Sequence, residues 1–177
     1  MPKLINIFGS PGSGKSTFAL FLTGELKMRG LDCEYSPEYI KYLIAKGDCN
    51  FDQLDILHNQ YHQILAYYNN SDIVVTDSPL LLSTIYGENY KHRKELFSLA
   101  KAFNSDFESI NILIEPPKDR EKYKDSLRLQ NYGQSLELFE KKFKNLLKYD
   151  MVIENFFSLP RENLISLCDL ILEKINE

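Results

Sequence analysis

The residues with the clearest chemical use form one short run near the start of the chain. Residues 9–17 read GSPGSGKST and match the pattern G-x-x-x-x-G-K-[ST], the phosphate-binding P-loop. Glycines let consecutive backbone N–H groups turn toward a polyphosphate, and the following helix N-terminus adds positive potential. The predicted nucleotide-binding residues are Gly9, Ser10, Pro11, Gly12, Ser13, Gly14, Lys15, Ser16 and Thr17.

Two side chains of this run are placed to act on a bound nucleotide. Lys15 is predicted to reach the β- and γ-phosphates of ATP, and the Ser16 hydroxyl to be a ligand of Mg²⁺. The surrounding sequence supports this, because an apolar strand is predicted before the run, and apolar residues recur at helical spacing from Phe18 to Leu26 after it. We therefore expect strand, loop and helix in that order, with ATP and Mg²⁺ as cofactors.

A carboxylate follows the third predicted strand, where a P-loop site normally has its second acidic residue. Asp77 ends the run 72–77 and is predicted to help hold Mg²⁺, directly or through water. The alternative is an aspartate that only caps the end of the strand. Ser78 comes next, where ATP-hydrolysing motors commonly have a glutamate that activates water. A serine there favours transfer to a bound acceptor over plain hydrolysis.

Two further side chains are candidates for the acceptor side. Glu38 follows the second predicted strand, where it can face the γ-phosphate and accept a proton from an attacking hydroxyl. The alternative is a glutamate in the first turn of a helix, favoured by the helix dipole. Gln60 lies on a predicted helix, and its amide offers the donor and acceptor that suit a nucleobase edge. A solvated polar face is the commoner role for such a glutamine.

A charged segment at about 116–134 is the candidate lid. Residues 118–128 contain five basic and three acidic side chains, and basic groups on a closing lid neutralise charge on a transferring phosphoryl group. The alternative is a solvated helix with i, i+4 ion pairs. Arg128 is the predicted catalytic and substrate-binding arginine of the lid, with Arg120 as the other possibility.

Composition limits the class of protein. The 177 residues predict a single domain over 1–177, and 44% hydrophobic residues are enough for an ordinary core. A net charge of −4 argues against extended binding of nucleic acid, which usually needs a broad basic face. No apolar run approaches the roughly 18 residues of a membrane span. The chain starts directly with a strand rather than a signal peptide, so we expect a cytoplasmic protein without a membrane partner.

The functional residues need elements to position them, and apolar strands alternate with amphipathic helices. This alternation predicts an α/β fold with a five-stranded parallel sheet flanked by helices, and the phosphate loop after the first strand makes it a P-loop NTPase. The segment at about 116–134 lies between the last two strands, where kinases have their lid, so we expect a nucleotide-kinase-like fold with a helical lid. The predicted strands are 3–9, 32–36, 72–77, 109–114 and 149–153. The predicted helices are 15–29, 38–46, 52–69, 80–86, 90–103, 135–148 and 160–175.

Several motifs together resemble a known family. The P-loop, Pro37-Glu38-Tyr39, the run TDSPLLLS at 76–83 and the lid pattern Tyr123…Arg128-x-Gln130 resemble a family of small P-loop proteins common in bacteriophages. That family is described as AAA-type ATPases or nucleotide kinases and is similar to the nicotinamide riboside kinase domain. Its members usually have Gly-Arg-x-Gln in the lid, whereas Leu127 replaces the glycine here.

Deoxynucleoside kinases have a related arrangement of functional residues. Their base is a glutamate after the second strand, which matches Glu38. Their Glu-Arg-Ser after the third strand aligns only loosely with Asp77-Ser78-Pro79, and the arginine is missing. The resemblance to both groups implies a kinase that binds ATP and a nucleoside or nucleotide.

Three functions follow from these observations. The first is transfer of the γ-phosphoryl group of ATP to a nucleoside- or nucleotide-type acceptor, with Lys15, Glu38, Asp77 and Arg128 as catalytic residues and Gln60 as a further substrate contact. The second keeps this chemistry but makes the acceptor a hydroxymethylated pyrimidine within bacteriophage DNA. The third is a regulatory P-loop NTPase that switches a protein partner. Mild acidity favours a small acceptor over a polymer.

Overall fold

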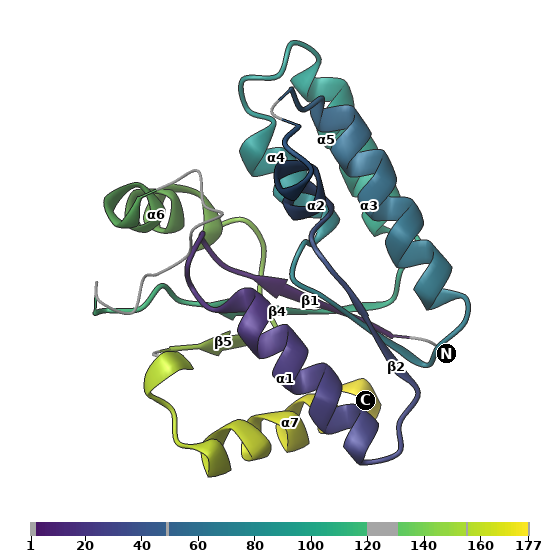
Figure 1. Cartoon of the computed structure of the whole chain (residues 1–177), viewed down its shortest axis with the longest axis vertical. Helices are drawn as coiled ribbons and strands as arrows, with labels where there is room; N and C mark the ends of the chain where they lie inside the picture. The colour runs from purple at the N-terminus through teal and green to yellow at the C-terminus, as the bar shows by residue number, and fades with distance from the viewer. Residues whose placement is uncertain (1–2, 49, 120–130, 155, 177) are drawn as a thin grey trace.

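Five short strands form one parallel sheet at the centre of the molecule. A computed structural model describes residues 3–48, 50–119, 131–154 and 156–176, and Figure 1 shows their arrangement. The strand order is β2-β3-β1-β4-β5. The chain therefore leaves β1 toward one edge of the sheet and later crosses to the other, so a crevice opens at the carboxyl ends of the central strands. The predicted α/β fold with a five-stranded parallel sheet is confirmed.

The strands and helices follow the predicted alternation. The strands are β1 (Lys3–Phe8), β2 (Cys33–Ser36), β3 (Ile73–Thr76), β4 (Ser109–Ile114) and β5 (Met151–Ile153). The α-helices are α1 (Lys15–Met28), α2 (Tyr39–Ala45), α3 (Gln53–Tyr68), α4 (Ser83–Tyr86), α5 (Arg93–Asn104), α6 (Tyr132–Leu138) and α7 (Arg161–Asn176). Short 3₁₀ or π turns are η1 (Leu80–Leu82), η3 (Phe139–Phe143) and η4 (Phe156–Ser158).

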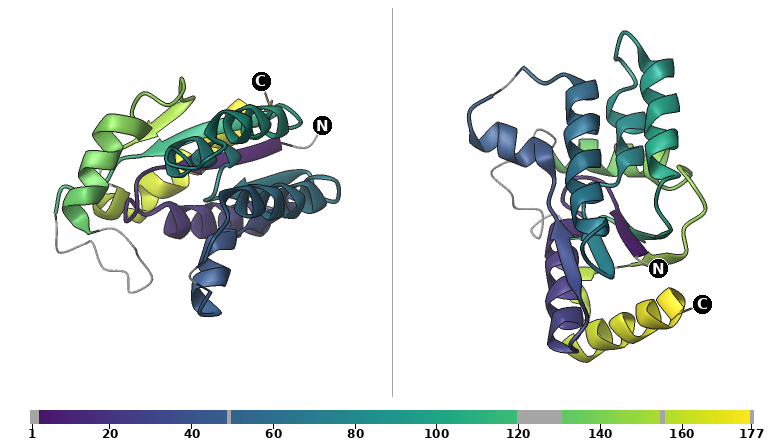
Figure 2. Two further views of the ribbon diagram at one scale, coloured as in Figure 1. Left: turned by 90° about the horizontal axis from the view of Figure 1, so that it is seen from above. Right: turned by 90° about the vertical axis from the view of Figure 1, so that its right-hand side faces the viewer.

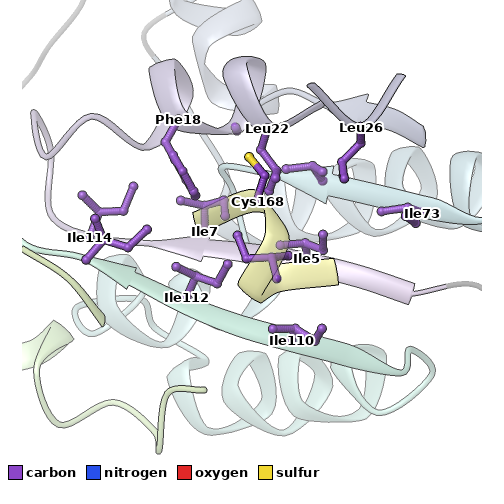
Figure 3. Packing of buried hydrophobic residues seen from close by; sticks show 14 of the residues in the cluster. Ile5, Ile7, Phe18, Leu22, Leu26, Ile73, Ile110, Ile112, Ile114 and Cys168 are labelled. Carbon is purple, nitrogen blue, oxygen red and sulfur yellow. The ribbon is translucent and has the colours of Figure 1, made fainter. Parts of the chain in front are cut away.

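Helices cover both faces of the sheet, which is what a strand apolar on both sides requires. In Figures 1 and 2, α1 and α7 lie on one face, and α2 to α5 lie on the other. Alternate residues of β1 serve the two layers: Ile5 and Ile7 pack among the buried residues of α1 and α7 (Figure 3), and Leu4 packs with those of α3 and α5. Within the described helices, none combines the length and apolarity needed to cross a membrane.

Sheet register explains why the predicted functional residues meet. Asn6 of β1 pairs with Thr76 of β3, and Thr76 pairs with Ser36 of β2. The Thr76 hydroxyl also donates to the Ser36 carbonyl oxygen at 2.9 Å. Because these three strands end at one edge, the segments that follow them, which begin at Gly9, Pro37 and Asp77, emerge side by side.

The helix predicted over 135–148 is wrong at both ends. Helix α6 begins earlier because Asn131 caps it: the Asn131 side chain accepts from the Gln134 backbone N–H at 3.0 Å, and the Gln134 side chain accepts from the Asn131 N–H at 2.9 Å. After Leu138 the chain widens into a π turn. That turn brings Phe139 and Phe143, four residues apart, onto one buried face.

Candidate functional site: a phosphate loop joined to an apolar cavity

The P-loop has the backbone that its glycines predict. Gly12 and Gly14 have φ of 83° and 100°, which other residues rarely adopt. Gly9 has φ of 152°, and a Cβ there would lie 2.6 Å from the Ile114 carbonyl oxygen. The loop therefore needs glycine at Gly9 both for its backbone angle and for its close approach to β4. Lys15, the first residue of α1, donates to the Ser10 carbonyl at 3.3 Å, which brings its ammonium back over the loop.

A serine from a distant part of the chain holds the loop from behind. Ser135 of α6 is fully buried, and its hydroxyl lies 2.9 Å from the Ser10 hydroxyl and is hydrogen-bonded to the Pro11 carbonyl oxygen. This contact was not predicted, because Ser135 stood only at the start of the helix predicted over 135–148. The capping pattern Asn131-x-x-Gln134 was the signal that could have placed Ser135 in the first turn of a helix.

Asp77 is the centre of a polar network at the foot of the loop. It is fully buried, and its carboxylate accepts hydrogen bonds from the Ser16 hydroxyl and from the Tyr35 hydroxyl, the latter at 2.9 Å. The Lys41 ammonium lies 3.4 Å from Asp77 Oδ2. A buried carboxylate is tolerated only with such partners. The two hydroxyl groups and the ammonium therefore together compensate the buried charge of Asp77.

Two members of this network, Tyr35 and Lys41, were not predicted. Burial raises the pKa of the Tyr35 hydroxyl, and the negative charge of Asp77 raises it further, so Tyr35 stays a neutral donor. Burial lowers the pKa of the Lys41 ammonium, but the charges of Asp77 and Glu38 outweigh this and leave it raised. The i, i+3 spacing of Glu38 and Lys41 was the one sequence signal for the pair.

Glu38 lies at the start of α2 but does not cap it. Its side chain makes no capping hydrogen bond to a backbone N–H of the first turn; instead Glu38 Oε2 lies 3.3 Å from the ammonium of Lys41, the third residue of the helix. Gln60 of α3 holds the backbone on either side of Glu38. Its buried side chain accepts from the Tyr39 N–H at 2.9 Å and donates to the Pro37 carbonyl at 3.2 Å. The amide of Gln60 is thus already hydrogen-bonded to this backbone. Its role as a substrate contact stays a prediction.

A cavity of about 550 Å³ connects the P-loop to the space between α2, α3 and the segment η1–α4. Lys15, Ser16 and Glu38 line its phosphate end, with Thr17 and Lys41 beside them. The far end is lined mainly by apolar side chains. These are Ile40, Ile44, Phe51, Ile56, Leu57, Leu80, Leu82 and Tyr86.

The donors at the phosphate end suit Mg²⁺. Hydroxyl and carboxylate oxygens are the ligands this ion prefers, and it usually takes only one or two protein ligands together with phosphate and water. Ser16 and Asp77 supply adjacent oxygens of this kind, and the Lys41 ammonium already lies against both. Among the described residues no group of three or more His, Cys, Asp or Glu could hold a metal. A nucleotide phosphate would complete the ligand set.

The structure thus brings together the predicted P-loop residues, Glu38 and Asp77, and places Gln60 at the cavity wall. Arg128 and Arg120 lie outside the described residues, together with most of the predicted lid. The catalytic and metal-binding roles of all these residues stay predictions.

The sheet order, the loop after β1 and the carboxylate after β3 define an α/β P-loop NTPase fold. A family model described as an AAA domain matches residues 4–154, which is most of the chain. The chain therefore belongs to this AAA domain family. A comparison with curated proteins found no match.

Solved structures support the same fold at low sequence identity. The APS kinase CysC of Mycobacterium tuberculosis, in complex with AMPPNP and APS, has a TM-score of 0.57 and 12% identity, with 99% of this chain and 98% of that chain covered. The NadR protein in complex with NR has a TM-score of 0.67 and 17% identity, with 99% of this chain covered. The present chain spans about half of the NadR chain, 52%.

Proposed function

We propose that this protein is a kinase that uses ATP and Mg²⁺ to phosphorylate a hydroxyl group of a nucleoside-type acceptor. The observation that supports it best is the continuous cavity, which joins the P-loop to a separate compartment between α2, α3 and α4. Its volume of about 550 Å³ lies within the range of small-molecule sites. A P-loop protein that only hydrolyses ATP needs no such compartment beside the phosphates.

The charge distribution of the cavity supports a neutral acceptor. Among the described residues that line it, formal charges are confined to Lys15, Glu38 and Lys41, all at the phosphate end. The far compartment offers aromatic surface from Phe51 and Tyr86, together with aliphatic side chains. A flat heterocycle would fit such walls, with a sugar or hydroxymethyl oxygen directed toward the P-loop.

The proposed reaction needs a base on the acceptor side. The acceptor oxygen forms a bond to the γ-phosphorus while the bond from phosphorus to the β,γ-bridging oxygen breaks, and that electron pair leaves with ADP. Glu38 takes the proton of the attacking hydroxyl. Lys15 and the loop N–H groups stabilise charge on the phosphates, and Arg128 of the lid is the proposed further cation.

Bound Mg²⁺ would neutralise phosphate charge, and Ser16 and Asp77 are the residues that would hold it. The backbone of the loop orients the phosphates. The Gln60 bonds to the Pro37 carbonyl and Tyr39 N–H keep the Glu38 segment in place against α3. Two solved structures of similar fold support this class of reaction: APS kinase in complex with AMPPNP and APS, and NadR in complex with NR. The molecules bound in each are known for that protein alone.

The test is a screen of ADP formation against candidate acceptors, with the phosphorylated product identified by mass spectrometry. The panel holds nucleosides, nucleoside monophosphates, nicotinamide riboside and DNA with hydroxymethylated pyrimidines. We expect rapid ADP formation with a neutral nucleoside-type compound and slow hydrolysis without one. If only the modified DNA is phosphorylated, the acceptor is a base within a polymer. ADP formation that no acceptor stimulates would contradict a kinase and favour a regulatory NTPase.

A further inference from the structure

One side chain of the site has no role in the reaction proposed so far. The Lys41 ammonium donates to the Ser16 hydroxyl at 2.6 Å and lies 3.4 Å from Asp77 Oδ2. It also lies 3.3 Å from Glu38 Oε2. Its three partners come from three separate segments: the start of α1, the end of β3 and the start of α2. A single positive charge therefore joins the metal side of the cavity to the acceptor side.

Lys41 occupies the oxygens that a divalent cation would use. Mg²⁺ binds such oxygens at about 2.0–2.1 Å, and an ammonium in hydrogen-bond contact with the same atoms would lie close to the ion. Two positive charges at that separation repel one another strongly in a partly buried site. The ion and the ammonium cannot share Ser16 and Asp77, so one has to leave when the other binds.

We propose that Lys41 is a built-in counter-cation of the metal site: it holds Ser16 and Asp77 while the nucleotide is absent and is displaced when a metal-bound nucleotide arrives. This inference rests on the proposed nucleotide function. Asp77 is fully buried, so its charge needs a cation in both states. The lysine supplies that cation before the metal does, and the two bind in competition.

Displacement of Lys41 has a consequence for the acceptor compartment. Within the described helix α2 no residue is fully buried, so the helix packs against α3 through half-buried side chains only. Figure 2 shows α2 projecting from the rest of the molecule. Ile40 and Ile44 of this helix line the cavity, and Glu38 precedes it. Release of the Lys41 ammonium from Ser16 and Asp77 would free α2 to adjust around an acceptor after the nucleotide has bound.

The experiment measures Mn²⁺ binding to the full chain saturated with ADP, with free Mn²⁺ followed by electron paramagnetic resonance. Removing the competing charge in Lys41→Met should tighten Mn²⁺ binding roughly three- to tenfold. Lys46→Met removes an exposed lysine from the end of the same helix and should leave it unchanged. Lys41→Arg keeps a cation at the site, so its Mn²⁺ affinity should stay within about twofold of the wild-type value.

The outcomes separate this inference from the proposed function. Lys41→Gln is a second neutral variant, which decides the question if circular dichroism shows that Lys41→Met does not fold. Unchanged Mn²⁺ affinity in the folded neutral variant overturns the counter-cation role while leaving the nucleotide site intact. Weaker Mn²⁺ binding also overturns it, because Lys41 would then help to hold the loaded nucleotide. If ADP adds no Mn²⁺ site to the wild-type chain, the proposed nucleotide function fails and this inference fails with it.

Discussion

The phosphate side of the cavity is formed mainly by backbone, whereas the acceptor side is formed mainly by side chains. The phosphate side is a continuous run of nine residues, Gly9–Thr17, whose shape depends on backbone angles and on two close approaches of glycine to neighbouring atoms. The acceptor side is assembled from α2, α3, η1 and α4, and its shape depends on side chains that meet only in the folded chain.

This difference separates what a P-loop protein must have from what it can vary. Backbone N–H groups bind any polyphosphate, so the loop alone says little about the reaction. The acceptor side would determine the reaction through the carboxylate of Glu38, where this side meets the phosphates, and through the apolar walls around Phe51. Variants on the two sides should therefore fail in different ways, and the following predictions test that division.

The largest effect is expected on the phosphate side, from Lys15→Ala. Loss of a cation that stabilises the transferring phosphoryl group should raise the barrier by several kcal/mol and lower kcat at least about 10³-fold. Every acceptor should be affected alike. Steady-state kinetics of the folded variant, checked by circular dichroism, measure this. Near-normal turnover would remove the P-loop lysine from the mechanism.

On the acceptor side, Glu38→Gln should have an effect that depends on the acceptor. The amide keeps the size of the side chain but cannot take a proton, so transfer to a hydroxyl should slow by roughly 10²–10⁴-fold with little change in ATP binding. Transfer to a phosphate acceptor should fall far less, because that nucleophile is already ionised. Comparing kcat for both kinds of acceptor tests the role. A hydroxyl acceptor phosphorylated at near wild-type rate would leave Glu38 as a helix-start carboxylate only.

A matched pair of glycine substitutions tests whether the backbone conformation of the loop determines the structure of the phosphate side. Gly9→Ala places a methyl group 2.6 Å from the Ile114 carbonyl, so we expect a loss of about 2–4 kcal/mol in the free energy of unfolding. Gly24→Ala, within helix α1 and with open space around it, should instead raise that energy by about 0.5–1 kcal/mol. Urea titrations of the two variants give the difference. Equal midpoints would mean that the loop relaxes around the methyl group.

The same division explains how much the sequence could predict. The strand, loop and helix around Lys15 were predicted because their signals are local: an apolar run, glycines at fixed spacing and an amphipathic helix. Asp77 was found for a similar reason, since strand ends carry acidic residues in this class of site. The five strands followed from apolar runs bounded by polar turns, and only their ends moved by one or two residues.

The unpredicted residues act through contacts between distant segments. Tyr35 reaches Asp77 from the neighbouring strand, Lys41 reaches Ser16 from α2, and Ser135 reaches Ser10 over 125 positions of the chain. The local signals for Lys41 and Ser135 were weak, and Tyr35 had none, because the register of the sheet, the placement of α2 and the packing of α6 bring these residues to the site. Gln60 was noticed, but its partners Pro37 and Tyr39 could not be known before the fold.

We expect the smallest effect from a change at Gln60. This change tests whether Gln60 positions Glu38 or contacts the acceptor directly. Gln60→Met fills the same space but leaves the Tyr39 N–H and the Pro37 carbonyl without that amide. We expect kcat/KM for the acceptor to fall about tenfold, the equivalent of roughly 1–2 kcal/mol, with KM for ATP unchanged. The control is Gln63→Met, because Gln63 also donates to the Pro37 carbonyl, at 3.2 Å, but from a more exposed position on α3. The loss there should stay within about twofold.

The pattern across acceptors distinguishes the two roles of Gln60. A positioning residue lowers the rate by a similar factor for every acceptor, since it acts on the segment that carries Glu38 and does not touch the nucleobase of the acceptor. An amide that binds a base edge discriminates, because a base with a reversed donor and acceptor pattern loses nothing when the amide is removed. Rates for purine and pyrimidine nucleosides with the wild-type, Gln60→Met and Gln63→Met chains decide between them. A loss confined to one base would make Gln60 a specificity residue, and a uniform loss would make it part of the frame that holds the base catalyst.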